Sequence, residues 1–456
     1  MNLTLCILAA GQGKRMYSEL PKVLHRIAGK PLVGHVLDTG AALTLLPPIV
    51  IYGHGGELLR KEYRDRHLVW VEQREQLGTG HAVAQALSKI PLDSLVLILY
   101  GDVPLLTRET LEKLLAAAAP SGFSLLTAVL PDPTGYGRIV RDRSGTIVKI
   151  VEHKDAAADE LAINEINTGI MAIRGEYLHR WLPGIGNLNA QGEYYLTDCV
   201  GLAVAENIQV HAIATAEPTE VTGVNNRTQL AELERAYQRR QAHALMERGT
   251  TVMDPLRIDI RGELICGRDV IIDINAVFEG RVRLGDRVVI GPNCFIRDAE
   301  LGDEAVVLAN SVIEEAKIGV GARIGPFSRI RPETELGDGV HIGNFVEIKK
   351  SRIAKGSKVN HLAYVGDTEI GSRVNVGAGT ITCNYDGAHK HKTVIEDDVF
   401  IGSDTQLVAP VTIGRGATIG AGTTVTENVE AERLVISRVR QKSIAGWQRP
   451  RKAKKE

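Results

Sequence analysis

Short apolar runs alternate with helical patterns over roughly the first 225 residues, which is typical of an α/β sheet. The predicted strands cover residues 3–10, 48–52, 95–100 and 123–130. The run 95–100 is apolar at every position, so we expect both of its faces to be covered, as in the centre of a parallel sheet. The pattern therefore predicts a Rossmann-like domain with a mixed, mostly parallel sheet.

One long helix is predicted over residues 226–248. Leu230, Leu233 and Tyr237 recur there at helical spacing among charged residues, and Gly249 ends the pattern. We interpret residues 227–249 as a linker helix between a first domain, residues 1–226, and a second, residues 250–456.

A six-residue period begins at about residue 264. Branched aliphatic residues or leucines recur in trios such as Ile318, Ile324 and Ile330, each trio spans 17 or 18 residues, and glycine follows many of them. Three short strands per coil form a triangular prism, and the pattern resembles the left-handed parallel β-helix of hexapeptide repeats.

Such a period is also compatible with a purely structural solenoid or a trimerisation stalk, because it is a packing code. The ladder breaks once, in a polar excursion over residues 383–394. An insertion on one face of a solenoid usually serves binding, which favours a functional β-helix.

The composition is that of an ordinary globular protein and argues against several other classes. The 456 residues are 44% hydrophobic and 24% charged with a net charge of -1, so nothing global attracts nucleic acid or an anionic membrane. Five scattered cysteines without a CxxC pair argue against a disulfide framework or a zinc site. No run of about 18 apolar residues occurs and the N-terminus lacks a basic leader, so we expect a soluble cytoplasmic protein.

A glycine-rich turn, residues 8–16, follows the first predicted strand. Its backbone N–H groups could face a phosphate, with Arg15 and Lys22 neutralising the charge. The sequence matches neither the GxGxxG nor the Walker A pattern. A plain strand-to-helix connection is the alternative.

Asp102 lies at the carboxyl end of the apolar strand, where ligands bind in open α/β sheets. A carboxylate there is a hard oxygen ligand for Mg²⁺, and Asn225 could complete the site with substrate phosphates and water. The alternative role is a helix N-cap, but Thr107 is better placed for it. We therefore predict a metal site at Asp102 and Asn225.

Further motifs accompany these residues along the first domain: Gln73, the run 76–82, the glycine-flanked 135–138, residues 152–154, 164–169 and 223–226. Their order and spacing resemble the sugar-1-phosphate nucleotidyltransferases. Joined to the hexapeptide repeats, the chain resembles from end to end the bacterial family of bifunctional N-acetylglucosamine-1-phosphate uridyltransferases / glucosamine-1-phosphate N-acetyltransferases. One departure is Lys14, where the family usually has threonine.

The resemblance implies that the first domain joins UTP to N-acetylglucosamine-1-phosphate and releases pyrophosphate, with Arg15 and Lys22 as catalytic cations. It places uracil at Gln73, Gly78 and Thr79, and the sugar ring at Gly137, Glu152 and Asn167. The full set implied for UTP and UDP-N-acetylglucosamine is Leu8, Ala9, Ala10, Gly11, Lys22, Gln73, Gly78, Thr79, Tyr100, Gly101, Asp102, Gly137, Glu152, Asn167 and Asn225.

Two cations are predicted to project side by side from the β-helix. Arg331 and Lys349 follow equivalent corners one 18-residue coil apart, and stacked strands lie about 4.8 Å apart. Such like charges repel, so an anionic ligand such as a sugar phosphate is the favoured reason, with two solvated surface charges as the alternative. His361, Ala378, Ser403 and Ala421 hold equivalent places on another corner, where the small side chains leave a groove for an extended pantetheine arm.

The resemblance assigns roles to these positions. His361 would be the base that takes a proton from the glucosamine amine, a task suited to imidazole. Glucosamine-1-phosphate would contact Arg331, Lys349, Tyr364 and Asn375. Acetyl-CoA would contact Ala378, Asn384, Tyr385, Ser403, Ala421 and Arg438.

The predicted activity is thus acetylation of glucosamine-1-phosphate from acetyl-CoA, then uridyl transfer from UTP, which yields UDP-N-acetylglucosamine for the cell envelope. The family forms homotrimers, and we expect neither nucleic acid nor a membrane as partner. Two alternatives remain: a nucleotidyltransferase with an oligomerising β-helix, and a β-helix that only binds. The basic tail, residues 449–456, is expected to be solvated and receives no function.

Overall fold

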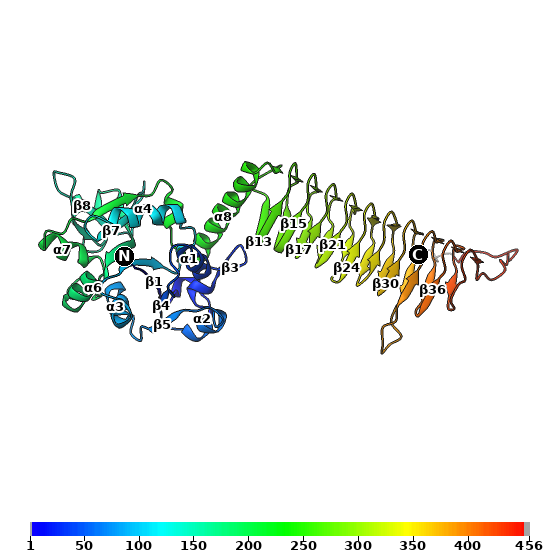
Figure 1. Cartoon of the computed structure of the whole chain (residues 1–456), viewed down its shortest axis with the longest axis horizontal. Coiled ribbons are helices and arrows are strands. Elements are labelled where there is room, and N and C mark those ends of the chain that lie inside the picture. Colours follow the sequence, from blue (N-terminus) through cyan, green and yellow to red (C-terminus); the bar gives the residue numbers. More distant parts are fainter. Residues whose placement is uncertain (1, 451–456) are drawn as a thin grey trace, which may run out of the picture. The chain divides into compact units, whose positions relative to one another are not determined.

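The computed structural model describes residues 2–450 (Figure 1). The chain divides into two compact units, one ending at Arg240 and the other beginning at Gln241. The division falls within the long helix α8 (Arg227–Glu247). In the part of the chain that is described, no helix is both long and apolar enough to cross a membrane.

The first unit is built on a mixed, mostly parallel sheet in the order β11-β7-β10-β6-β1-β4-β5. Only β10 runs antiparallel to its neighbours in this order, β6 and β7. The predicted sheet is confirmed, and the four predicted strands differ from the observed ones by at most one residue at an end. The strands are β1 (Leu3–Ala9), β4 (Ile49–Tyr52), β5 (Val69–Glu72), β6 (Leu95–Tyr100), β7 (Phe123–Val129), β10 (Glu165–Arg174) and β11 (His211–Ala214), with β8 (Arg138–Arg141) and β9 (Ile147–Val151) attached beside β10 and the hairpin β2 (Arg26–Ile27) and β3 (Lys30–Pro31) apart.

Two apolar clusters cover the two faces of this sheet. Val96 and Ile98 of β6 belong to one cluster, and Leu97 and Leu99 belong to the other. All four are fully buried, as the unbroken apolar run predicts. The helices of this unit are α1 (Leu32–Ala41), α2 (Gly56–Glu62), α3 (Thr79–Gln85), α4 (Arg108–Ala118), α5 (Ala158–Leu161), α6 (Gly175–Trp181) and α7 (Asp198–Ala205), with 3₁₀ turns η1 (Lys14–Met16), η2 (Lys22–Leu24), η3 (Leu87–Lys89), η4 (Leu182–Gly184) and η5 (Pro218–Val221).

The second unit is a parallel β-helix. One row of strands stacks in register: Val289 pairs with Val306, and Val306 pairs with Arg323. This row comprises β12 (Thr251–Val252), β14 (Ile271–Ile272), β16 (Val289–Ile290), β19 (Val306–Val307), β22 (Arg323–Ile324), β25 (His341–Asn344), β28 (Lys358–His361), β31 (Asn375–Val376), β34 (Phe400–Ile401), β37 (Thr418–Ile419) and β39 (Leu434–Val435).

The other two rows alternate along the chain and begin with two long strands that span both, β13 (Ile258–Cys266) and β15 (Ala276–Leu284). The second row continues with β17 (Phe295–Arg297), β20 (Val312–Glu314), β23 (Arg329–Ile330), β26 (Glu347–Lys349), β29 (Tyr364–Gly366), β32 (Ile381–Cys383), β35 (Gln406–Val408) and β38 (Thr424–Val425). The third continues with β18 (Glu300–Leu301), β21 (Ala316–Ile318), β24 (Thr334–Leu336), β27 (Arg352–Ile353), β30 (Thr368–Ile370), β33 (Thr393–Ile395) and β36 (Val411–Ile413).

The hexapeptide positions form the core of this unit. Ile290, Val307, Ile324, Ile342 and Val359 follow one another along the first row, and each is fully buried in a single continuous cluster. The polar excursion leaves the ladder between β32 and β33, and Figure 1 shows it projecting from the stack. The six-residue period therefore determines which side chains point into the core. The excursion lies outside this pattern, so its side chains are not required for the core.

Candidate active sites

A cavity of about 380 Å³ opens in the first unit at the carboxyl ends of β1, β5 and β6. The strands are parallel, so their ends meet at one edge of the sheet, as expected for an open α/β fold. The cavity is lined by Leu8, Ala9, Ala10, Gly11, Lys22, Val23, Gln73, Gln76, Gly78, Thr79, Ala82, Tyr100, Asp102, Glu193 and Asn225. Most residues assigned to UTP from the sequence thus converge on one space.

A lysine joins the two predicted metal ligands. The ammonium of Lys22 donates to the Asp102 carboxylate and to the side-chain oxygen of Asn225, the latter at 3.2 Å. The side chains of Lys22 and Asp102 are each only 14% exposed, so water screens this pair weakly. A cation therefore already lies between Asp102 and Asn225.

Backbone contacts place these three groups. The N–H of Val224 donates to the carbonyl of Asp102 at 2.9 Å, which holds Asn225 beside the end of β6. Gly13 has φ 62°, and a Cβ there would lie 2.7 Å from Lys22 Cβ. Glycine at this point lets the turn pack against the stem of Lys22.

The residues assigned to the sugar form a second group. The N–H of Asn167 donates to the carbonyl of Gly137 at 2.8 Å, and a Cβ at Gly137 would lie 3.3 Å from the carboxylate of Glu152. Burial raises the pKa of Glu152, while the hydroxyl of Thr197, 3.2 Å away, opposes the shift by donating to the carboxylate. The group offers one partly desolvated carboxylate and backbone amides, which suits sugar hydroxyls.

Tyr100 connects the two groups. Burial raises its pKa, with Glu152 and Asp102 adding to the effect, and the hydroxyl is hydrogen-bonded to Thr79. Gly101 follows Tyr100 and donates its N–H to the carbonyl of Leu8 at 2.9 Å, which ties β6 to β1 at the rim.

Two basic residues of the glycine-rich turn, Arg15 and Lys14, lie outside this cavity. Arg15 is exposed on η1 and is absent from the cavity lining. Lys14 is also exposed, and it borders a separate depression with Gln12 and His54. The role of Arg15 as a catalytic cation stays a prediction.

In the second unit, Arg331 and Lys349 do occupy equivalent positions on neighbouring coils, since Ile330 pairs with Ile348. Arg331 is not an unpaired cation, because its guanidinium lies 2.7 Å from the carboxylate of Glu347. The neighbouring ammonium of Lys390, in the excursion, lowers the pKa of Lys349 because the two like charges repel. Sequence spacing missed both neighbours, because neither is one whole coil away.

His361 ends β28, and its ring is anchored on one side. Nδ1 lies 3.2 Å from the side-chain oxygen of Asn344, and the two residues are register partners on neighbouring strands. An amide oxygen only accepts, so Nδ1 carries the proton and Nε2 keeps a lone pair. Asn344 precedes His361 by one 17-residue coil. The coil period in the sequence therefore could have identified Asn344 as the neighbour of His361.

The excursion contributes Asn384 next to Tyr364. The amide of Asn384 donates to the carboxylate of Asp367 and is 7% exposed. A Cβ at Gly366 would lie 2.5 Å from the Tyr364 hydroxyl and 2.8 Å from the Asn384 amide, so the three pack closely. Tyr385, in contrast, is 60% exposed at the base of the excursion.

The small residues assigned to acetyl-CoA form a continuous column. Asp404 donates its N–H to the carbonyl of Ala378 at 2.7 Å, and Gly422 donates to that of Ser403 at 2.8 Å. Arg438 continues the column by donating from Nε to the carbonyl of Ala421 at 3.0 Å. Asn375 lies on the same row, paired with Lys358 and Phe400.

The predicted base and the predicted phosphate clamp make no direct contact among the described residues, and their joint role stays a prediction. His361 ends a strand of the first row, with two residues between it and the start of β29, whereas Lys349 pairs with Gly366 at the far end of β29. In residues 2–450, no hydrogen bond or ion pair links His361 to Arg331 or Lys349.

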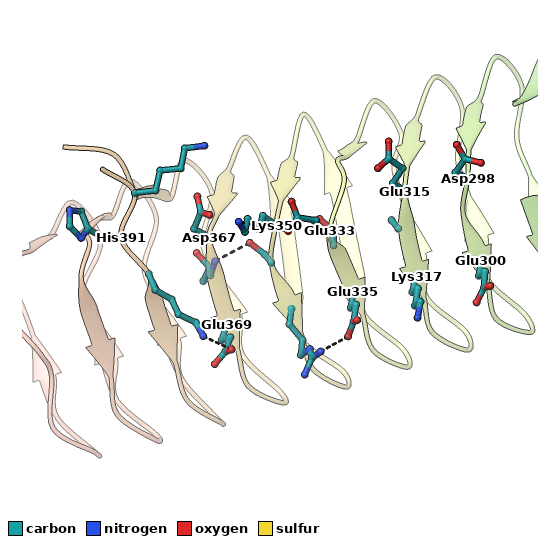
Figure 2. Close-up of a pocket in the computed structure, with 17 residues that line it drawn as sticks. Asp298, Glu300, Glu315, Lys317, Glu333, Glu335, Lys350, Asp367, Glu369 and His391 are labelled. Atoms are coloured by element: carbon teal, nitrogen blue, oxygen red, sulfur yellow. Dashed lines mark hydrogen bonds and ion pairs between the residues drawn. The ribbon is translucent and has the colours of Figure 1, made fainter. Parts of the chain in front are cut away.

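A charged groove of about 710 Å³ runs along the third row (Figure 2). Charges on the strands of this row alternate in sign from coil to coil, from Glu300 through Lys317 to Glu335 and onward. Several pair with a neighbour, as Arg352 does with Glu335 at 2.8 Å and Lys350 with Glu333 at 3.7 Å. Opposite charges on adjacent strands stabilise the stack. The groove is therefore explained by the packing of coils.

Known proteins resemble the chain over its whole length. The model of a MobA-like NTP transferase domain matches residues 5–251, and the model of the bacterial transferase hexapeptide (six repeats) matches residues 265–298, 315–350 and 392–427. The "Bifunctional protein GlmU" of Methylococcus capsulatus is 59% identical, with 100% of this chain and 99% of the relative covered. The protein of the same name from Cupriavidus pinatubonensis is 57% identical, with 100% of both covered.

A solved structure of UDP-glucose pyrophosphorylase complexed with UDP-glucose covers 53% of this chain and 100% of its own, at 15% identity and a TM-score of 0.44.

Proposed function

The chain belongs to the family of bifunctional GlmU proteins, and we propose on that premise that it makes UDP-N-acetylglucosamine in two steps, one in each unit. The β-helix acetylates glucosamine-1-phosphate from acetyl-CoA. The α/β unit then transfers UMP from UTP to the product and releases pyrophosphate.

Acetyl transfer needs a base beside the sugar amine. Nε2 of His361 has a free lone pair because Nδ1 is committed to Asn344, so it accepts the amine proton as the nitrogen attacks the thioester carbon. The carbon–sulfur bond breaks, the proton taken by His361 passes to the departing sulfur, and coenzyme A leaves as the thiol. We assign the sugar phosphate to Arg331, Lys349, Tyr364 and Asn375.

The acetyl donor is assigned to the column of small residues. Ala378, Ser403 and Ala421 lie on successive coils joined by backbone hydrogen bonds, and their small side chains suit an extended chain laid along the row. Asn384, Tyr385 and Arg438 border this space and supply polar contacts.

Uridyl transfer needs no protein nucleophile. A phosphate oxygen of N-acetylglucosamine-1-phosphate attacks the α-phosphorus of UTP, and the bond to the β-phosphate breaks. Repulsion between the two anions is the obstacle, so Lys22, with Arg15 as the second cation, positions and neutralises the phosphates. Gln73, Gly78 and Thr79 take the uracil, and Gly137, Glu152 and Asn167 take the sugar.

The residues present fit a magnesium ion. Asp102 and Asn225 offer hard oxygen atoms, and the Lys22 ammonium between them shows that the position favours a cation. Residues 2–450 contain no group of three or more His, Cys, Asp or Glu side chains able to hold a metal. We assign the remaining coordination to substrate phosphates and water. When bound, Mg²⁺ would neutralise charge that develops on the transferred phosphate.

We further propose a homotrimer with acetyl-transfer sites between subunits. Phe327 and Phe345 stack at 5.4 Å on neighbouring coils, and with Leu362 they form an apolar strip whose members are 49%, 56% and 64% exposed. Exposed apolar strips of this kind mark interfaces. A neighbouring subunit packed there would lie beside His361, which adjoins Leu362, and could contribute residues to the acetyl-transfer site.

We also assign residues 1–226, 227–249 and 250–456 to the uridyltransferase domain, the linker helix and the acetyltransferase domain. The division of the chain within α8 supports these limits. A cytoplasmic location is supported by the five cysteines, none of which is in a disulfide.

The observation that carries the proposal is the convergence of Lys22, Asp102 and Asn225 with the UTP-assigned residues in one cavity. The test is product analysis of the purified chain with glucosamine-1-phosphate, acetyl-CoA and UTP. We expect UDP-N-acetylglucosamine, and free thiol in equal amount. Product from added N-acetylglucosamine-1-phosphate but no thiol release would instead support a nucleotidyltransferase with an oligomerising β-helix.

A further inference from the structure

Gln73 is a buried amide at the rim of the first cavity. It follows β5 directly, its backbone N–H donates to the carbonyl of Tyr52 at 2.8 Å, and the residue is 3% exposed. It nevertheless lines the cavity. Its polar atoms must therefore be satisfied by the protein or by whatever fills that space.

Both N–H groups of this amide are committed. Nε2 lies 3.2 Å from the carbonyl oxygen of Gly78 and 3.0 Å from Nδ1 of His81. A backbone carbonyl only accepts, so the nitrogen end of the amide must face Gly78 and the orientation of Gln73 is fixed by chemistry. The second N–H then requires that His81 Nδ1 be an acceptor.

His81 is thereby held as one neutral tautomer, with its proton on Nε2. It lies on α3, and the side-chain amide of Gln85, one turn later, is 3.1 Å from that nitrogen. As placed, the Gln85 nitrogen also donates to the backbone carbonyl of His81 at 3.4 Å. A half turn of this exposed amide gives up that long contact and lets its oxygen accept the proton on Nε2. In this series His81 donates to Gln85 and accepts from Gln73. The oxygen of the Gln73 amide is therefore the end that is presented to the cavity.

The oxygen of the Gln73 amide is left over. Among the described residues, no hydrogen bond is made to Oε1. The atom is not one of the side-chain atoms buried without a partner, and Gln73 lines the cavity, so Oε1 is open to a ligand there. A buried acceptor without a partner is costly, and a ligand that brings an N–H to it is favoured over one that brings a lone pair.

We propose that His81 is the positioning residue that makes this cavity select uracil over cytosine. The inference rests on the proposed function, which places the base at Gln73. Uracil carries a hydrogen on N3 and donates to Oε1, whereas N3 of cytosine carries a lone pair and would face the oxygen without a proton between them. Without His81 only the Gly78 carbonyl, 3.2 Å away, holds the nitrogen end of the amide. The amide then turns over more readily, and its N–H would suit cytosine.

The test compares kcat/KM for UTP and for CTP in the full-length enzyme with N-acetylglucosamine-1-phosphate as acceptor. We expect His81→Phe to lower the UTP/CTP ratio at least about ten-fold, and Gln73→Leu to lower it similarly. His81→Asn should stay within about three-fold of wild type, because an asparagine oxygen takes the place of Nδ1. His179→Phe is the matched control, since His179 bonds the carbonyl of Ile90 at 2.9 Å and does not line the cavity.

A loss of folding would lower both rates together and leave the ratio unchanged. An unchanged ratio in folded His81→Phe overturns the proposal, and so does an unchanged ratio in Gln73→Leu, which decides the matter if His81→Phe does not fold. Acetyl transfer by the same samples reports that the other unit is intact. Absence of uridyl transfer in the wild type would refute the proposed function instead.

Discussion

The ammonium of Lys22 occupies the place between Asp102 and Asn225 that a divalent ion would take. A metal entering the nucleotide-free enzyme must therefore displace it. We predict that Lys22→Met binds Mn²⁺ more tightly than wild type in the absence of nucleotide, although the variant loses uridyl transfer.

The size of the effect follows from the burial of the pair. Two unit charges about 4 Å apart attract by roughly 4 kcal/mol at an effective dielectric constant near 20. Both side chains are 14% exposed, and the cost of desolvating them offsets part of this attraction. A remainder of about 1.4–3 kcal/mol corresponds to a 10- to 100-fold change in the Kd for Mn²⁺.

The assay is titration of Mn²⁺ followed by electron paramagnetic resonance, with and without UTP. Phosphates offer Lys22 another partner, so the advantage of the variant should shrink when UTP is present. Lys14→Met is the matched control, because Lys14 is an exposed lysine of the same loop that does not line the cavity. Equal Mn²⁺ affinity of wild type and Lys22→Met without nucleotide would refute the reasoning.

Three other outcomes are expected. Asp102→Ala should abolish uridyl transfer and spare acetyl transfer, both followed by product formation, because the two activities are assigned to separate units; loss of both in folded protein would contradict this. His361→Ala should lower the acetyl-transfer rate by about 10²- to 10⁴-fold and leave uridyl transfer to added N-acetylglucosamine-1-phosphate unchanged, whereas a loss under about ten-fold would exclude a general base. Burial raises the pKa of Glu152, so the folded state keeps a proton that the unfolded state releases between the ordinary and the raised pKa, and stability falls as pH rises through that window. Glu152→Gln should therefore raise Tm relative to wild type more at pH 7 than at pH 4 in calorimetry, and an equal shift at both pH values would show that the carboxylate is not desolvated.

Much of the architecture was readable from the sequence. In the β-helix, side-chain direction repeats every six residues, so positions such as Ile324 and Ile342 could be assigned to the core without any tertiary information. The same holds for 95–100, where an unbroken apolar run requires cover on both faces. These features follow from local periodicity, because strand geometry alone decides which way each side chain points.

Tertiary structure decided the chemistry of the sites. Lys22 contacts Asn225 from 203 residues away, and no periodicity relates them. Lys390 reaches Lys349 only because the excursion folds back on the stack, which hexapeptide spacing does not describe. The direction of the Gln73 amide likewise depends on a carbonyl and a ring nitrogen from the next segment. A sequence pattern specifies the face on which a residue lies, whereas hydrogen bonds of this kind depend on loop paths and rotamers that only the packed chain determines.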